Sequence, residues 1–227
     1  MSATSEPVSA VESGSGSTTL EQETEPDFGR VLAGWRECVS GDDDVQMRTY
    51  LNAYAELTRF ISRMGTVFGF VVKDVNKKIK RLSKMLEEAN ANYCTINRQL
   101  VYETGESKAR KYGSGTQITG RLCRAMLFVT EVIEAVRVEK DDTKMGPVVR
   151  AIYDRTLAHH MPWYINKAVQ MGLHSLKRRK DLFAQFTGSY TIEQVLLIMQ
   201  QTVKQATLVR HRLQLIYAKH NLTDMLH

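Results

Sequence analysis

Apolar residues recur along most of this chain at intervals of three and four positions, the spacing of one face of an α-helix. The longest such run lies between Tyr54 and Leu86. Its pattern predicts one long amphipathic helix whose apolar face packs on a core. The apolar positions are Leu57, Phe60, Ile61, Met64, Val67, Phe68, Val71, Val75, Ile79, Leu82 and Leu86.

Shorter segments with the same period predict the remaining helices. Asp27 is a suitable N-cap for a helix that continues to Val39. Pro162 fits the first turn of another, because proline lacks the amide hydrogen that a helix interior needs. Since no segment shows the sustained alternation of a strand, we predict an all-α fold. The other helices are expected at residues 91–104, 118–136, 148–157, 162–176 and 192–218.

The first 26 residues differ from the rest of the chain. They are rich in Ser, Thr, Glu and Gly and nearly free of large apolar side chains. Such a segment buries too little apolar surface to offset the entropy lost on ordering. We therefore predict a disordered acidic tail at residues 1–26 and a single domain at residues 27–227.

The net charge of +6 conceals a division along the chain. Residues 1–27 contain six acidic side chains and no Lys or Arg, so the remaining 200 residues carry +12. A basic body suggests an anionic partner. Three classes of partner stay open at this point: a nucleic acid, a membrane surface or a phosphorylated ligand.

Several functional classes are disfavoured. No apolar run reaches the roughly 18–20 residues that span a bilayer, and the N-terminus lacks the basic and apolar segments of a secretory signal. The three cysteines, Cys38, Cys94 and Cys123, form no CxxC pair, so we expect reduced thiols in a cytosolic protein and no metal site. Enzymatic activity is disfavoured, because the sequence has no HExxH, GxGxxG or P-loop motif and no nucleophile elbow; a Ser/His/Asp triad assembled by the fold stays open.

Two segments carry charged side chains beside apolar faces. Asp74 and Lys78 are four residues apart, hence on one side of a helix, and Arg81 follows one turn later. They form either a surface ion pair or a site where the carboxylate accepts hydrogen bonds from a polar ligand and the cations bind an anion. Arg121 borders the apolar face of the 118–136 helix, where its guanidinium group either reaches solvent or contacts a ligand.

A basic cluster, Lys177 to Lys180, follows the helix expected at residues 162–176. Because the helix dipole favours cations at a C-terminus, a solvated helix end is the simplest interpretation. A membrane-binding patch remains open. A nucleic-acid patch is disfavoured, because few aromatic residues lie nearby and no known binding motif is present.

Four segments, in this order, resemble the glycolipid transfer protein family, most of all its ceramide-1-phosphate transfer branch. They are Met64-Gly65-Thr66-Val67-Phe68 with Lys73-Asp74 and Lys78-Ile79; Arg121-Leu122-Cys123-Arg124-Ala125-Met126; His160-Met161-Pro162-Trp163 with Lys167-Ala168-Val169; and Ile216-Tyr217-Ala218-Lys219-His220-Asn221-Leu222. The resemblance implies a two-layer, all-helical fold of about eight helices, with a hydrophobic lipid pocket between the layers and no cofactor.

The resemblance also implies roles for single residues. Asp74 would bind the amide and the hydroxyl group of the lipid's ceramide part. Lys78 and Arg121 stand where members that bind a phosphate head group carry Lys and Arg. Those members have a second Arg four residues before the first, a place that Gln117 takes here. We expect a head-group site made of Asp74, Lys78, Arg81, Gln117, Arg121 and His160.

Two further positions concern the segment around Pro162. The histidine of the family normally precedes its tryptophan by two residues, whereas His160 precedes Trp163 by three and Met161 takes the usual place. Trp163 matches the tryptophan with which the family contacts membranes; the alternative is a tryptophan buried in the core. We expect membrane docking through Trp163, Lys167, Lys177, Arg178 and Arg179.

The first functional hypothesis is a monomeric, cytosolic carrier that is not an enzyme and contacts membranes transiently. It would bind ceramide 1-phosphate or a related phosphosphingolipid, with the lipid chains in a pocket lined by the predicted helices at 54–86, 118–136 and 192–217. Two alternatives keep the fold: a carrier of neutral glycosphingolipids, and a lipid sensor with little transfer activity. Binding of a nucleic acid is the least favoured hypothesis.

Overall fold

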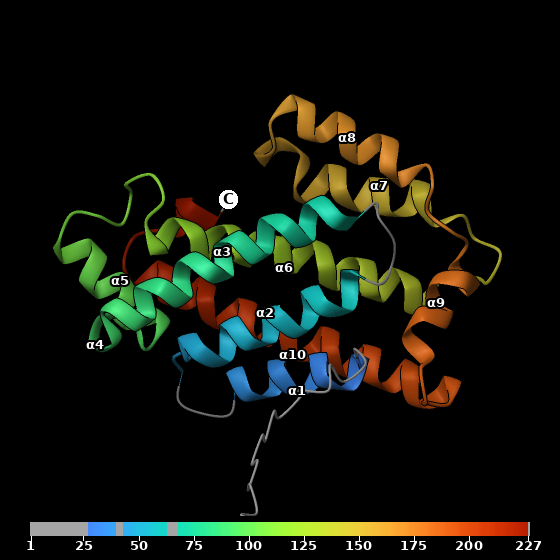
Figure 1. Cartoon of the computed structure of the whole chain (residues 1–227), viewed down its shortest axis with the longest axis horizontal. Helices are drawn as coiled ribbons and strands as arrows, with labels where there is room; N and C mark the ends of the chain where they lie inside the picture. Colours follow the sequence, from blue (N-terminus) through green and yellow to red (C-terminus); the bar gives the residue numbers. More distant parts are fainter. Residues whose placement is uncertain (1–26, 40–42, 63–67, 227) are drawn as a thin grey trace, which may run out of the picture.

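The computed structural model describes residues 27–39, 43–62 and 68–226, which form helices and two isolated β-bridges (Figure 1). The all-α prediction is confirmed, with ten α-helices in these residues rather than about eight. The predicted tail at residues 1–26 lies outside them. The α-helices are α1 (Phe28–Cys38), α2 (Met47–Ser62), α3 (Gly69–Glu88), α4 (Asn90–Tyr93), α5 (Ile96–Gly105), α6 (Gly115–Val138), α7 (Met145–Thr156), α8 (Trp163–Leu173), α9 (Arg179–Thr187) and α10 (Ile192–Lys219). The 3-10 helices η2 (Ala158–His160) and η3 (Thr223–Leu226) follow α7 and α10.

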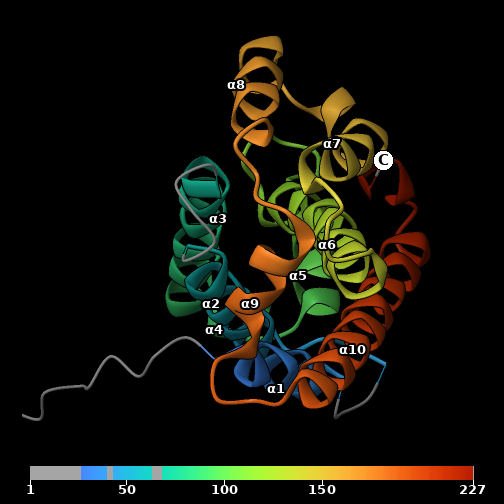
Figure 2. The same cartoon turned by 90° about the vertical axis from the view of Figure 1, so that its right-hand side faces the viewer.

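The helices form two layers. In the first layer α1, α2 and α3 pack in sequence, and in the second α10, α6 and α7 pack side by side. Contacts of α1 with α10 and of α3 with α6 join the layers, while α8 packs on α7 (Figure 2). No helix of the described segments combines the length and the apolar composition needed to cross a bilayer. This arrangement sets α3 opposite α6, α7 and α8.

The single helix predicted from Tyr54 to Leu86 is wrong. α2 ends at Ser62 and α3 begins at Gly69, and the two helices run in opposite directions against each other (Figure 1). Both turn their apolar faces to the same core, where Leu57 of α2 is buried. Because periodicity reports which face is apolar and not where the chain reverses, the two faces look continuous in the sequence.

Three other boundaries also differ from the predictions. The helix expected at residues 91–104 is divided into α4 and α5, because Thr95 caps α5 by accepting a hydrogen bond from the amide of Arg98. Pro162 precedes its helix as the N-cap instead of lying in the first turn. α9 was not predicted. Arg178 occupies the N-cap position of this helix, so residues 177–180 lie at the start of a helix, and their interpretation as a solvated C-terminal helix end is wrong.

Two buried tyrosines hold the first half of α6 from opposite layers. The hydroxyl group of Tyr54 in α2 donates to the carbonyl oxygen of Leu122 at 2.6 Å, and that of Tyr217 in α10 donates to the carbonyl oxygen of Thr116 at 2.6 Å. Burial raises the pKa of both phenols well above the usual value, so they stay protonated donors. The segment of α6 that carries Arg121 is therefore held by α2 of the first layer and by α10 of its own layer.

A buried carboxylate fixes the N-terminus of the same helix. Glu103 is 2% exposed and accepts hydrogen bonds from the amides of Gly115 and Thr116, at 2.7 and 2.8 Å. It also accepts from the hydroxyl groups of Tyr93 and Thr116. Free amides at a helix N-terminus carry partial positive charge, so a carboxylate is well suited to this position without a cationic partner.

The cysteines are free, as predicted. Burial raises the pKa of the Cys38 and Cys123 thiols to about 12. Both therefore remain thiols at neutral pH and are poor nucleophiles. Their surroundings show that they act as small apolar side chains of the core, since each is 2% or 3% exposed.

We predict that Glu103→Ala lowers the free energy of unfolding by about 3 kcal/mol, because it leaves buried donors at the α6 terminus without an acceptor. Urea denaturation followed by circular dichroism measures the change. The control is Glu106→Ala, whose exposed carboxylate pairs with Lys108, and it should leave the midpoint unchanged. Equal stability of the two variants would contradict the anchoring role of Glu103.

Candidate functional site

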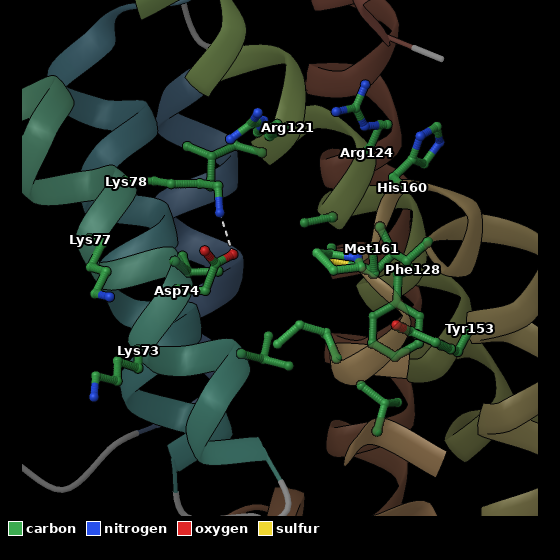
Figure 3. Close-up of a pocket in the computed structure, with 18 of the residues that line it drawn as sticks. Lys73, Asp74, Lys77, Lys78, Arg121, Arg124, Phe128, Tyr153, His160 and Met161 are labelled. Carbon is green, nitrogen blue, oxygen red and sulfur yellow. Dashed lines mark hydrogen bonds and ion pairs between the residues drawn. The ribbon is translucent and has the colours of Figure 1, made fainter. Parts of the chain in front are cut away.

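A cavity of about 740 Å³ lies between α3 on one side and α6, α7, η2 and α8 on the other (Figure 3). Lys78, Arg121, Arg124 and His160 gather toward one end, and Phe128 and Tyr153 lie toward the other (Figure 3). The cavity thus has a cationic rim and an apolar interior. The apolar lining residues are Phe68, Val71, Val75, Leu122, Ala125, Phe128, Leu157, Met161, Pro162, Ile165, Val169 and Leu173.

The wall differs from the prediction in one element. Residues of α3 and α6 line the cavity as expected, but the predicted contribution of the helix at 192–217 is wrong. That helix, α10, packs against α1, α5 and α6, and α7 and α8 take its place in the wall. Since both α7 and α10 carry buried apolar residues at helical spacing, the sequence pattern does not tell which of them borders the cavity.

The apolar interior continues toward α1, α2 and α9. A second space of about 40 Å³ shares Phe68, Val71 and Phe128 with the main cavity. Its far wall includes the rings of Phe28, Phe60 and Phe186, which pack with centroids 4.8 to 4.9 Å apart. The shared residues place this aromatic cluster beside the apolar interior of the main cavity.

At the rim, Asp74 and Lys78 form the ion pair that their spacing predicts (Figure 3). The Lys78 side chain is only 15% exposed, whereas that of Asp74 is 56% exposed. The pair is thus desolvated on the side of the ammonium group and open on the side of the carboxylate. The carboxylate oxygens can accept hydrogen bonds from a ligand, and the ammonium group keeps further donors for an anion.

Two arginines of α6 stand opposite this pair. The Arg121 guanidinium group lies 5.9 Å from the ring centre of Tyr112, a cation–π contact that orients it at the rim. Arg124 donates to the carbonyl oxygen of Met225 at 3.0 Å. Burial, and to a lesser degree the charge of Arg121, lowers the pKa of Arg124. An anion bound beside both guanidinium groups would relieve this repulsion.

His160 and Met161 both line the cavity. The turn of η2 brings His160 to the rim although it lies three residues before Trp163. Asn166 of α8 supports this turn, because its side-chain amide donates to the carbonyl oxygens of Ala158 and Met161 at 3.0 and 3.3 Å. The unusual spacing in the sequence therefore does not remove the histidine from the site.

Gln117 and Arg81, also predicted for the head-group site, do not line the cavity. The Gln117 side chain accepts a hydrogen bond from the amide of Gly113 at 2.9 Å. Gly113 has a φ of +75°, and a Cβ atom there would meet the Arg81 guanidinium group at 2.4 Å. Both side chains thus contact the loop before α6 at Gly113 and do not reach the cavity.

Trp163 opens α8 and is 75% exposed, which excludes the alternative of a core tryptophan. The neighbouring Tyr164 is 58% exposed, and Lys167 is exposed one turn later. Two aromatic side chains and a lysine at one helix end match the composition of membrane-interface segments. Because residues of this helix also line the cavity, the exposed aromatic end lies next to it.

The basic cluster at residues 177–180 is tied to the loop between α6 and α7. Arg179 is 13% exposed at its side chain, donates to the carbonyl oxygen of Val136 at 2.8 Å and pairs with Asp141 at 2.6 Å. Arg178 and Lys180 lie 3.5 and 3.7 Å from the Asp142 carboxylate. Intramolecular contacts therefore use most of the charge that the sequence suggested for membrane docking, and Lys177 alone of the four has no such contact in the described residues.

Two rim residues were missed by the sequence reasoning. Arg124 lies three residues after Arg121, so helical spacing alone puts both on one side of α6. Tyr112 precedes α6 in a polar loop, and no local pattern marks it. Its role follows only from the fold, which turns the loop back over the α6 terminus.

Both the sequence and the structure of this chain are similar to those of known proteins. A model of the family "Glycolipid transfer protein (GLTP)" matches residues 45–188. The ceramide-1-phosphate transfer protein of Danio rerio is 31% identical over 204 residues, which cover 86% of this chain and 96% of that protein.

Solved structures extend the likeness to the backbone. The structure of the mouse ceramide-1-phosphate transfer protein without ligand superposes with a TM-score of 0.81 and 23% sequence identity. The match covers 87% of this chain and 98% of the mouse chain. The human protein in complex with 12:0 ceramide 1-phosphate superposes with a TM-score of 0.80 and 22% sequence identity. The match covers 88% of this chain and 99% of the human chain. At these identities the structures establish the shared fold.

We predict that Arg179→Gln lowers the free energy of unfolding by about 1–2 kcal/mol, because its hydrogen bond to Val136 and its ion pair with Asp141 join α9 to the second layer. Lys177→Gln removes the same charge from an exposed position and should leave stability unchanged. Thermal unfolding of both variants measures the difference. If Arg179→Gln unfolds at the wild-type temperature, the cluster does not have this structural role.

Proposed function

We propose, since this chain belongs to the glycolipid transfer protein family, that it binds a phosphosphingolipid of the ceramide 1-phosphate type and carries it between membranes. The observation that carries the proposal is the composition of the cavity. Its interior is apolar, and its rim holds Lys78, Arg121, Arg124 and His160 with one carboxylate, that of Asp74. A ligand with apolar chains and an anionic head group fits both parts.

The rim suits a phosphate monoester. Such a group carries about −1.5 to −2 charges at neutral pH and offers three acceptor oxygens. Lys78 approaches from α3, and Arg121 and Arg124 approach from α6, so donors reach the head group from both layers. Hydrogen bonds between charged partners are about twice as strong as neutral ones, which favours phosphate over an uncharged sugar.

Asp74 has a different task in this proposal. Its exposed carboxylate would accept hydrogen bonds from the amide and the hydroxyl group of the ceramide part. The ion pair with Lys78 holds the carboxylate on the cavity side of α3. His160, on the opposite wall, would donate to the amide carbonyl oxygen of the same ligand.

The chains would supply the binding energy. Transfer of each methylene group from water to an apolar interior contributes about 0.8 kcal/mol. Removal of a lipid from a membrane needs an apolar space of comparable quality, and the main cavity and its extension toward α9 provide it. Transfer needs binding and release alone, so the proposal requires no nucleophile, metal ion or cofactor.

We further propose that the chain acts as a monomer on the cytosolic side and touches the membrane only during uptake and release. Trp163 and Tyr164 would enter the interfacial region, since their rings are exposed at the helix end beside the cavity. Lys167 would contact anionic lipids nearby. Arg179 would not take part in docking, because its guanidinium group contacts Val136 of α6 and Asp141.

In a vesicle-to-vesicle assay with labelled lipids, we predict transfer of ceramide 1-phosphate and much slower transfer of galactosylceramide. Asp74→Val removes the acceptor for the ceramide amide and should reduce ceramide 1-phosphate transfer at least about tenfold. Asp154→Val is the matched control, because Asp154 is exposed on α7 and pairs with Arg150 outside the cavity. Absence of transfer for both lipids, or wild-type transfer by Asp74→Val, would refute the proposal.

Head-group recognition can be tested separately from chain binding. Arg121→Gln should weaken binding of soluble short-chain ceramide 1-phosphate about 10- to 100-fold, because one charged hydrogen-bond donor is lost. Binding of the ceramide with the same chains and no phosphate should not change. Arg48→Gln, an exposed change on α2, serves as the charge-matched control. Equal losses for both lipids would indicate damage to the cavity instead of lost phosphate recognition.

Removal of the exposed indole tests docking. Trp163→Ala should slow transfer between vesicles at least about fivefold while binding of the soluble short-chain lipid in bulk solution stays unchanged. The control is Met171→Ala, which removes an exposed apolar side chain from α8, the helix that also carries Trp163. Unchanged transfer by Trp163→Ala would remove this residue from the docking surface.

A further inference from the structure

A row of lysines follows the outer face of α3. Lys73, Lys77, Lys80 and Lys84 are spaced by four, three and four residues, which places them along one side of the helix. All four are exposed. At a rise of 1.5 Å per residue the row is about 16 Å long. We refer to these four residues as the α3 lysine row.

Three of the four lysines have no ion-pair partner in the residues that the structure describes. Lys84 lies 3.5 Å from the carboxylate of Glu88, whereas Lys73, Lys77 and Lys80 have no ion pair in the described residues. Between Val75 and Leu86 the helix contains no acidic residue. The α3 lysine row therefore differs from the cluster at 177–180, whose cations contact Asp141 and Asp142.

The row is placed at the mouth of the cavity without belonging to the head-group site. Lys73 and Lys77 are among the residues that border the cavity. Their amino groups nevertheless point away from the cavity, on the side of α3 opposite to Asp74 and the amino group of Lys78 (Figure 3). Their charge is thus directed to the surroundings of the protein and leaves the head-group site to other residues.

The other side of the mouth is formed by α8, with its exposed aromatic end at Trp163 and Tyr164. Residues of both α3 and α8 line the cavity, so the two helices stand at its border. The mouth is therefore flanked by exposed lysines on α3, three of them without an ion pair in the described part of the chain, and by exposed aromatic side chains on α8. A surface that offers both negative charge and an apolar interior complements these two features together.

We propose that the α3 lysine row binds an anionic bilayer surface and turns the mouth of the cavity toward the membrane. This inference rests on the proposed lipid transfer, but it concerns a separate surface and a separate set of lipids. The lipids bound by the row stay in the bilayer, and their negative head groups supply the attraction. The aromatic end of α8 then enters the same interface, so that the cavity opens directly onto the lipids to be exchanged.

The magnitude follows from general membrane electrostatics. A lysine close to an anionic membrane surface strengthens binding about fivefold, so three such residues together account for about 100-fold. The attraction is screened within a Debye length of about 8 Å at physiological ionic strength. Binding through the row should therefore weaken steeply when salt is added, while the apolar contact of Trp163 should not.

The test compares two triple variants of the full chain in a vesicle sedimentation assay. The first variant is Lys73→Gln/Lys77→Gln/Lys80→Gln. The charge-matched control is Lys140→Gln/Lys204→Gln/Lys219→Gln, three exposed lysines away from the mouth and without an ion pair in the described residues. Vesicles of pure phosphatidylcholine and vesicles with added phosphatidylserine are used at low and at high salt.

The first variant should bind the phosphatidylserine vesicles about 100-fold less tightly than the wild type at low salt, and the control should bind them normally. All three proteins should bind pure phosphatidylcholine equally weakly. Wild-type binding of the phosphatidylserine vesicles by the first variant, or an equal loss in the control, would overturn the proposal.

Titration of the same variants with soluble short-chain ceramide 1-phosphate separates this inference from the proposed function. The first variant should bind the soluble lipid as tightly as the wild type, because its lysines point away from the head-group site. If no protein binds the soluble lipid but the vesicle result holds, the carrier function fails and the docking surface stands. If soluble binding holds and the vesicle result fails, only the docking surface is lost.

Discussion

The structure depends on the fixed position of the first half of α6. This helix forms part of the second layer, borders the cavity and carries both rim arginines, so any shift of it would misplace the head-group site. Glu103 caps its terminus, and Tyr54 and Tyr217 hold its carbonyl groups from opposite layers. Each of these bonds is buried, where a hydrogen bond is strong and an unmade one is costly.

This constraint explains how one cavity combines two different environments. The polar anchors lie behind the rim, at the end where α6 begins, and the remainder of the helix is free to present Phe128 and its apolar neighbours to the interior. Arg124 links the rim to the C-terminal segment through the carbonyl oxygen of Met225. Gly120 permits that approach, because a Cβ atom there would lie 2.8 Å from the same oxygen. The site is thus positioned before a ligand arrives, which lowers the entropic cost of binding.

The sequence was informative where the deciding contact is local. The spacing of Asp74 and Lys78 predicts an ion pair that the structure contains, and helical periods located most of the helices. It was misleading where the deciding contact is distant. Arg179 pairs with Asp141, 38 residues away, so its cluster looked free for a membrane. α9 is only nine residues long and begins with charged side chains, so it contains too few apolar positions for a helical period to be recognised.

The central claim is that the cationic rim selects a phosphate head group for an apolar cavity. Isothermal titration of the wild-type protein with short-chain ceramide 1-phosphate and with galactosylceramide of the same chain lengths tests it most directly. The account predicts binding of one lipid molecule per protein, with the phosphate form at least about tenfold tighter and its advantage reduced by added salt. Equal affinity for the two lipids at every salt concentration would contradict it.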